Sequence, residues 1–248
     1  MRIITLAIAF LAAAVAASAQ TDDRANESAN YTLEVQDFIE LNVVDGIRVD
    51  YRAMPDSAGW VSFTATPETA SKIMFSNNRK KLTIQTSALD HPYENMPVVR
   101  VYSTILSNVT NTGDSLTRVL SAAPVEKMKI KVMGNGSIEV DGVKADQVEA
   151  SVDTGCGNVT VTGSARKAKL RNVGTGTVDA SGLTADEARV FVFGPGPVDC
   201  DVREKLTVYG MGKGRVLLHG EPAKITNRSI GVKVEQHQAH DAAEGPQE

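Results

Sequence analysis

Acidic side chains recur at matching positions of a repeat in the second half of the chain, and they are the residues best suited to chemistry. They are Glu139, Asp141, Asp179, Asp199 and Asp201. If successive repeats stack at the strand spacing of about 4.8 Å, Asp179 and Asp199 become neighbours. Carboxylates this close repel each other unless a cation, a hydrogen bond or a raised pKa compensates. The pattern favours either a binding site for Ca²⁺ or sugar hydroxyls, or a solvated acidic face that keeps the protein soluble.

The same carboxylates permit a second hypothesis, a β-helical polysaccharide lyase or hydrolase. A hydrolase needs two carboxylates across a groove, and a lyase needs a basic group beside a neutralising cation. Lys213, Arg215 and His219 follow the acidic residues and could supply basic groups. The short strands and tight glycine turns leave no long loops from which to build groove walls. We therefore predict a non-catalytic protein without a resident cofactor, Ca²⁺ being the one ion that the acidic residues suit.

Composition excludes further classes of function. The chain of 248 residues has 26 Lys and Arg against 30 Asp and Glu, a formal net charge of -4, and no segment gathers the positive charge. Nucleic acid is therefore not a predicted partner. The sequence contains no P-loop, Rossmann fingerprint, zinc cluster or nucleophile elbow, so no metal site and no catalytic residue is predicted from motifs.

A Gly-x-Gly triplet returns five times after residue 130, at intervals of 21, 19, 20 and 18 residues. Four residues after the first glycine of each triplet stands a β-branched apolar residue. These residues are Ile138, Val159, Val178, Val198 and Val216. Polar and apolar positions then alternate, which is the pattern of a strand with one inward and one outward face. A second short strand precedes each triplet, so a repeat of about 20 residues holds two strands and two glycine turns.

A repeat of this length cannot bury its own apolar face, so successive copies must stack. A leucine-rich repeat would need regular leucines, whereas the inward positions here are Val, Ile and Ala. An antiparallel sandwich would not keep an equivalent residue at every twentieth position. The sequence therefore predicts an all-β protein in which residues 126–234 form a parallel β-solenoid with coils of about 20 residues.

This register predicts that the two cysteines stay unpaired. Cys200 falls on the inward positions, whereas Cys156 lies between the two glycines of a turn two coils earlier. Two coils correspond to about 9.6 Å of stacking, which is beyond the reach of a disulfide. We expect Cys200 to be a buried small side chain and Cys156 to carry a free thiol.

Residues 35–125 are less regular and are predicted to form an N-terminal β region that caps the solenoid. Strand-like alternation is broken at an Asp45-Gly46 turn, and a short helix is expected to begin at Pro67. Most of the aromatic residues lie in this region. Either a cap or first coils of the solenoid in this region would close the open end of the solenoid and hide its edge strand.

Both ends of the chain are predicted to lie outside the fold. Residues 1–19 have the form of a signal peptide, because Arg2 precedes an apolar run that ends in small residues before cleavage after Ala19. The run is shorter than the roughly 20 residues that span a bilayer, so no transmembrane anchor is predicted. Residues 20–34 are expected to be a linker and residues 235–248 a disordered tail. We expect secretion across the inner membrane to the periplasm or the cell surface.

Several segments together resemble a known family. A strand from Phe38 to Val43 leads to Gly46-Ile47-Arg48-Val49, a strand follows at Lys81 to Ile84, and the Gly-x-Gly repeats complete the pattern. This layout is similar to the putative auto-transporter adhesin, head GIN domain family over about residues 35–220. The resemblance implies a right-handed parallel β-helix and an exported protein of Bacteroidetes-type bacteria. It transfers no catalytic residue, because the family has no established active-site motif.

Two functional hypotheses follow. The first is an exported adhesin or a surface or periplasmic binding module, which presents a repeated polar face to a glycan or a cell-surface protein. The second is the β-helical polysaccharide lyase or hydrolase described above, for which fold analogy alone is weak support. We favour the binding module.

Overall fold

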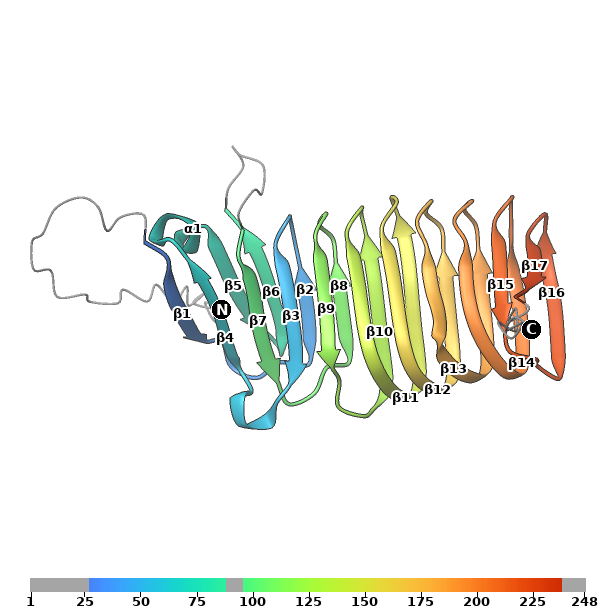
Figure 1. Ribbon diagram of the computed structural model, residues 1–248, viewed down its shortest axis with the longest axis horizontal. Coiled ribbons are helices and arrows are strands. Elements are labelled where there is room, and N and C mark those ends of the chain that lie inside the picture. The colour runs from blue at the N-terminus through green and yellow to red at the C-terminus, as the bar shows by residue number, and fades with distance from the viewer. Residues whose placement is uncertain (1–26, 88–95, 238–248) are drawn as a thin grey trace, which may run out of the picture.

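The computed structural model describes residues 27–87 and 96–237 and confirms the predicted fold class. Strands make up 67% of the described residues, which form a β-solenoid of about 6 turns with coils of roughly 20 residues. In Figure 1 the strands lie across the long axis and stack from the N-terminal cap to the last coil. The predicted signal peptide, residues 1–19, lies outside the described residues.

The repeat region consists of long strands that bend once and serve two parallel ladders. Val198–Asp201 of β14 pairs with β15, whereas Lys205–Met211 of the same strand pairs with β16. We call the outward side of the first ladder face A and that of the second ladder face B. The strands are β10 (Val125–Met133), β11 (Ser137–Thr154), β12 (Asn158–Asn172), β13 (Val178–Val192), β14 (Val198–Met211), β15 (Arg215–His219), β16 (Lys224–Ile230) and β17 (Lys233–Gln236).

The core lies between the two ladders and follows the predicted register. The five β-branched residues that follow the glycine triplets pair from coil to coil along the first ladder, and all five are fully buried. Cys200 is 2% exposed on the same inward face, two residues after Val198. Cys156 is exposed in a turn, and the structure describes both cysteines as free. Each coil thus buries a narrow layer of aliphatic side chains, which suits Val, Ile and Ala better than aromatic rings.

The repeated glycines are required because successive turns approach each other closely. A Cβ atom added to Gly176 would lie 1.8 Å from the carbonyl oxygen of Gly157 in the preceding coil. The second glycine of every triplet has a backbone oxygen of the preceding turn within 2.6 Å of such a Cβ. The periodic spacing therefore reflects turn-on-turn stacking as much as turn geometry.

Two buried asparagines secure the turns from inside. Asn172 takes a place on the second ladder that Val152 and Val192 occupy in the adjacent coils. Its Nδ2 donates to the carbonyl oxygens of Gly176 at 2.8 Å and Pro197 at 3.0 Å. Asn111 donates in the same way to two carbonyl oxygens, at 2.7 and 3.2 Å. Carbonyl groups that face the interior of the turn are thereby paired rather than left unsatisfied.

The N-terminal half contributes further coils, and their order in space differs from their order in the chain. The strand β2 lies between β6 and β8, and β3 lies between β7 and β9. The chain forms the β2–β3 coil first, adds the β6–β7 coil on its outer side, and then crosses back to β8 and β9. These strands are β2 (Glu40–Val43), β3 (Arg48–Ala53), β6 (Lys81–Thr86), β7 (Val98–Ser103), β8 (Asn108–Asn111) and β9 (Leu116–Ser121).

A smaller set of elements forms the cap itself. The strands β1 (Ala29–Glu34), β4 (Trp60–Ala65) and β5 (Ile73–Asn78) pair antiparallel, with β4 on β7 and β5 on β6. The helix α1 (Pro67–Ser71) has Pro67 in its first turn, as predicted, and the 3-10 helix η2 (Pro55–Ser57) joins β3 to β4. Stacked aromatic rings fill the cap, with Phe63 between Tyr31 and Phe75 at centroid distances of 5.2 and 6.0 Å.

Most of residues 35–125 forms coils of the solenoid, one of the two arrangements expected for this region, because their alternating apolar residues are the same inward pattern as in the repeat. The predicted boundaries differ from the structure in two places. The strand β1 occupies the last six residues of the predicted linker 20–34, where it pairs with β4. The strand β17 extends into the predicted tail 235–248, and the amide of His237 donates to Leu218 O at 2.8 Å. The remainder of that tail lies outside the described residues.

Candidate functional site: an acidic face and an axial groove

The predicted acidic residues lie on face A, but only some of them meet. Glu139, Thr160, Asp179 and Asp199 are successive partners along the first ladder, so a threonine separates Glu139 from the two aspartates. Asp141 is exposed at a register shift between Val140 and Val143. The ladder therefore brings Asp179 and Asp199 together, as predicted, and leaves Glu139 and Asp141 apart from them.

Hydrogen bonds within the chain occupy several of these carboxylates. Asp179 Oδ1 accepts from the amide of Ser181 at 3.0 Å and from its hydroxyl at 2.6 Å. Asp201 Oδ2 accepts from Thr184 Oγ1 at 3.1 Å. Asp199 differs, because its Oδ1 is buried without a hydrogen-bond partner among the described residues. Burial raises the pKa of Asp199, and the charge of Asp179 raises it further.

The basic residues of the enzyme hypothesis lie near this pair without enclosing it. Arg215 and His219 on β15 lower the pKa of Asp199 through their charge, against the larger effect of burial. Lys213 is exposed in the turn before β15. The ring centroids of His219 and His237 are 4.8 Å apart. Across residues 27–87 and 96–237 no three His, Cys, Asp or Glu side chains converge as metal ligands.

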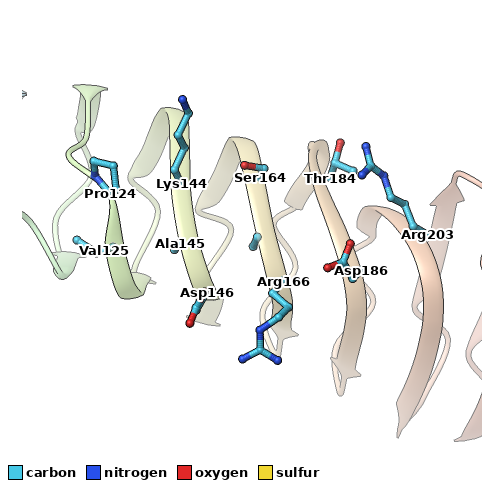
Figure 2. A pocket seen from close by; sticks show the side chains of 11 residues that line it. Pro124, Val125, Lys144, Ala145, Asp146, Ser164, Arg166, Thr184, Asp186 and Arg203 are labelled. Carbon is cyan, nitrogen blue, oxygen red and sulfur yellow. The ribbon is translucent and has the colours of Figure 1, made fainter.

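A groove along the solenoid axis is the feature that sequence reasoning missed. It is open to solvent, has a volume of about 550 Å³ and crosses β10 to β14 near the bends that separate the two ladders. Figure 2 shows Lys144, Ser164 and Thr184 on one side of it and Asp146 and Arg166 on the other. The lining residues are Pro124, Val125, Lys144, Ala145, Asp146, Ser164, Ala165, Arg166, Thr184, Asp186 and Arg203.

Small side chains lie along this groove. Val125, Ala145 and Ala165 pair in succession along the strands and line it. The same register continues to Ala185 and Val202, which are buried in the core and do not line the groove. A methyl group fills less space than a longer side chain, so the two alanines leave room between the charged residues that flank them. The sequence carried the signal, because Lys-Ala-Asp at 144–146, Ser-Ala-Arg at 164–166 and Thr-Ala-Asp at 184–186 recur every 20 residues.

The groove is lined by charged side chains of both signs that have no partner among the described residues. Lys144, Asp146, Arg166, Asp186 and Arg203 form no ion pair or side-chain hydrogen bond with the part of the chain that the structure describes. All are exposed except Asp186, which is half-buried. Their donors and acceptors are therefore free to bind a polar ligand that follows the axis.

Comparison with known proteins gives the family of the chain. The model of the family described as putative auto-transporter adhesin, head GIN domain, matches residues 37–222, which is most of the chain. The chain belongs to this family. The resemblance found in the sequence is thereby confirmed, and the matched segment contains the whole groove and every solenoid strand up to β15. A search of curated proteins finds no significant match.

Solved structures of three bacterial proteins share the fold. The crystal structure of a putative adhesin from Bacteroides fragilis matches with a TM-score of 0.77 and 15% identity, covering 86% of this chain and 98% of the other. A putative adhesin from Parabacteroides distasonis matches with a TM-score of 0.70 and 21% identity, covering 86% and 98%. A second protein from that organism, described as a putative lipid binding protein, matches with a TM-score of 0.64 and 15% identity, covering 85% and 97%. Within the described residues, no helix is long and apolar enough to cross a membrane.

Proposed function

We propose that this family member is an exported, non-catalytic adhesin that binds a linear glycan along the axial groove. The observation that carries the proposal is the row of small side chains at Val125, Ala145 and Ala165, flanked by charged side chains without partners among the described residues. Charged groups bind sugar hydroxyls through charge-assisted hydrogen bonds. A sugar unit in an extended glycan is similar in length to the coil spacing of about 4.8 Å, so each coil can repeat the same contact.

The way the groove is built favours a glycan over a peptide. An extended peptide usually binds by adding a strand to a free sheet edge, through backbone hydrogen bonds. The segments of β11, β12 and β13 that cross the groove are paired on both sides. Their backbone groups are already used, so the groove offers side chains alone. Side-chain donors and acceptors without a strand edge suit hydroxyl-rich ligands.

The proposed location follows from the signal peptide predicted at residues 1–19 and from membership of an adhesin family. We propose that the protein is secreted across the inner membrane and acts in the periplasm or at the cell surface. There the groove would meet polysaccharides of the cell envelope, of a neighbouring cell or of a host.

A glycan array with matched variants tests the proposal. We expect the purified protein to bind one class of linear glycan, and Arg166→Ala and Asp186→Asn each to weaken binding about tenfold or more, since a hydrogen bond to a charged group is lost. Arg189→Ala is the control, because Arg189 is exposed on face B and does not line the groove. Equal losses in the control and in the groove variants, or no glycan binding at all, would contradict a groove site. Release of glycan fragments would instead support the lyase or hydrolase hypothesis.

A further inference from the structure

A second concavity lies at the N-terminal cap, apart from the axial groove. It is open to solvent and has a volume of about 460 Å³, beside the connection between β3 and β4, which projects from the edge of the solenoid in Figure 1. The lining residues come from β1, β4, β7 and η2 with its preceding residue. They are Thr32, Met54, Asp56, Ser57, Trp60, Ser62 and Tyr102. None of them lines the axial groove.

Backbone hydrogen bonds hold this pocket in shape. Trp60 pairs with Glu34 of β1, and the antiparallel register of β4 with β7 places Tyr102 opposite Trp60 on the other side. The preceding residue, Gly59, donates to Tyr102 O at 2.9 Å and accepts from the amide of Val35 at 2.8 Å. Gly59 has a φ of +80°, and an added Cβ would lie 2.6 Å from the backbone of Gln36, so another residue would strain this turn. The indole is thus presented by a fixed turn.

The pocket combines an exposed aromatic surface with unused polar groups. Trp60 is 41% exposed and Met54 is 41% exposed, although both are large apolar side chains. Within the described chain, the side chains of Thr32, Asp56 and Ser57 form no hydrogen bond or ion pair. The hydroxyl groups of Ser62 and Tyr102 are equally free there. Exposed apolar surface in a concave site, surrounded by a few free polar groups, is typical of a small-molecule site.

We propose that this cap pocket binds one pyranose unit of a neutral sugar. A pyranose has a face of C–H groups, which an indole ring can contact, and a rim of hydroxyls, which carboxylate and hydroxyl groups can bind. Asp56 is the one charged residue among those that line the pocket, so its carboxylate accepts from sugar hydroxyls and disfavours an anionic sugar. This site is independent of the groove, and it stands whether or not the groove binds a glycan.

Trp60 is the sole tryptophan of the chain, so fluorescence reports on this pocket directly. We titrate the purified protein with glucose, galactose, mannose and N-acetylglucosamine. At least one sugar is expected to shift the emission saturably, with a dissociation constant in the millimolar range. Asp56→Asn should weaken that binding about tenfold while keeping the reporter. Asp114→Asn is the matched control, because Asp114 is exposed in a turn that does not line the pocket.

Further variants separate this site from the groove. Trp60→Ala should abolish saturation-transfer NMR signals from the bound sugar, provided that the melting temperature shows a folded protein. Arg166→Ala should leave the titration unchanged, and a loss of the signal in this groove variant would overturn the proposal. So would the absence of a saturable change with all four sugars, or equal binding by wild type and Asp56→Asn.

Discussion

The close stacking of turns makes a quantitative prediction about Gly176. An alanine there would place its Cβ 1.8 Å from the carbonyl oxygen of Gly157, whereas ordinary contact begins at 3.4 Å. The two coils would have to move apart by about 1.6 Å at this turn. Such a shift breaks two bonds that join these coils at the turn, from Thr175 N to Gly155 O, at 2.9 Å, and from Thr177 N to Asn158 Oδ1, at 3.1 Å.

The expected cost combines overpacking with these lost bonds. Overpacking costs about 1–3 kcal/mol and each hydrogen bond about 1 kcal/mol, so Gly176→Ala should lower the free energy of unfolding by about 3–5 kcal/mol. The melting temperature would then fall by about 10 °C for a protein of this size. Denaturant unfolding and differential scanning calorimetry measure both quantities.

Gly182→Ala is the matched control for this experiment. Gly182 is exposed, and a Cβ there comes nearest to the Cγ2 atom of Thr162 at 3.0 Å, whereas the one backbone atom among its nearest neighbours, Thr162 Cα, is at an ordinary contact distance of 3.7 Å. Its effect should stay below about 1 kcal/mol, since alanine also reduces the entropy of the unfolded chain. Equal destabilisation by the two substitutions, or a change below 1 kcal/mol for Gly176→Ala, would refute the stacking of turns described above.

Three further predictions follow from buried titratable groups. Asp199→Asn should raise the melting temperature at pH 7 by about 2–4 °C, because it removes a partly buried charge whose Oδ1 has no hydrogen-bond partner among the described residues. The expected gain in free energy of unfolding is about 1 kcal/mol, since the partial exposure of the carboxylate reduces the effect. The folded protein holds the Asp199 proton more tightly than the unfolded chain, so the free energy of unfolding of the wild type should decline as pH rises above the ordinary pKa of 3.8. The free energy of unfolding of Asp199→Asn should decline less, and urea unfolding at a series of pH values measures both. Burial raises the pKa of Tyr51 to about 12, so unfolding free energy should fall between pH 10 and pH 12, and Tyr51→Phe should reduce that fall in the same assay. A thiol reagent should label one cysteine of the native protein, Cys156, and two after denaturation, because burial raises the pKa of Cys200 to about 12; two labels before unfolding would contradict the register.

The repeat could be predicted from the sequence because its determinants are local. Each coil carries its own glycines and its own alternation of apolar residues, and a fixed period places equivalent residues above one another. Val159 and Val198 needed no tertiary information beyond that period to be assigned to the core. The same logic identified Cys200 as an inward residue and Asp179 and Asp199 as neighbours.

The features that were missed depend on long-range arrangement. The insertion of β2 and β3 between later coils leaves no trace in the local pattern, since all these strands alternate alike. Asn172 was not identified as a core residue because an asparagine is polar, and its role appears once its amide is seen beside two turn carbonyls. The groove was not predicted for a different reason, because the sequence interpretation used the acidic residues and not the alanines that recur at 145, 165 and 185.

Calorimetric titration with oligosaccharides of increasing length tests the central proposal most directly. Lys144, Ser164, Thr184 and Arg203 come from four successive strands, β11 to β14, which stack at about 4.8 Å. For a glycan class identified on the array, we expect the dissociation constant to fall with each added sugar up to about four or five units and then to level off. Arg166→Ala should reduce the fall in the dissociation constant that each added sugar unit produces. A dissociation constant that is independent of length, or one that Arg166→Ala leaves unchanged, would contradict binding along the groove.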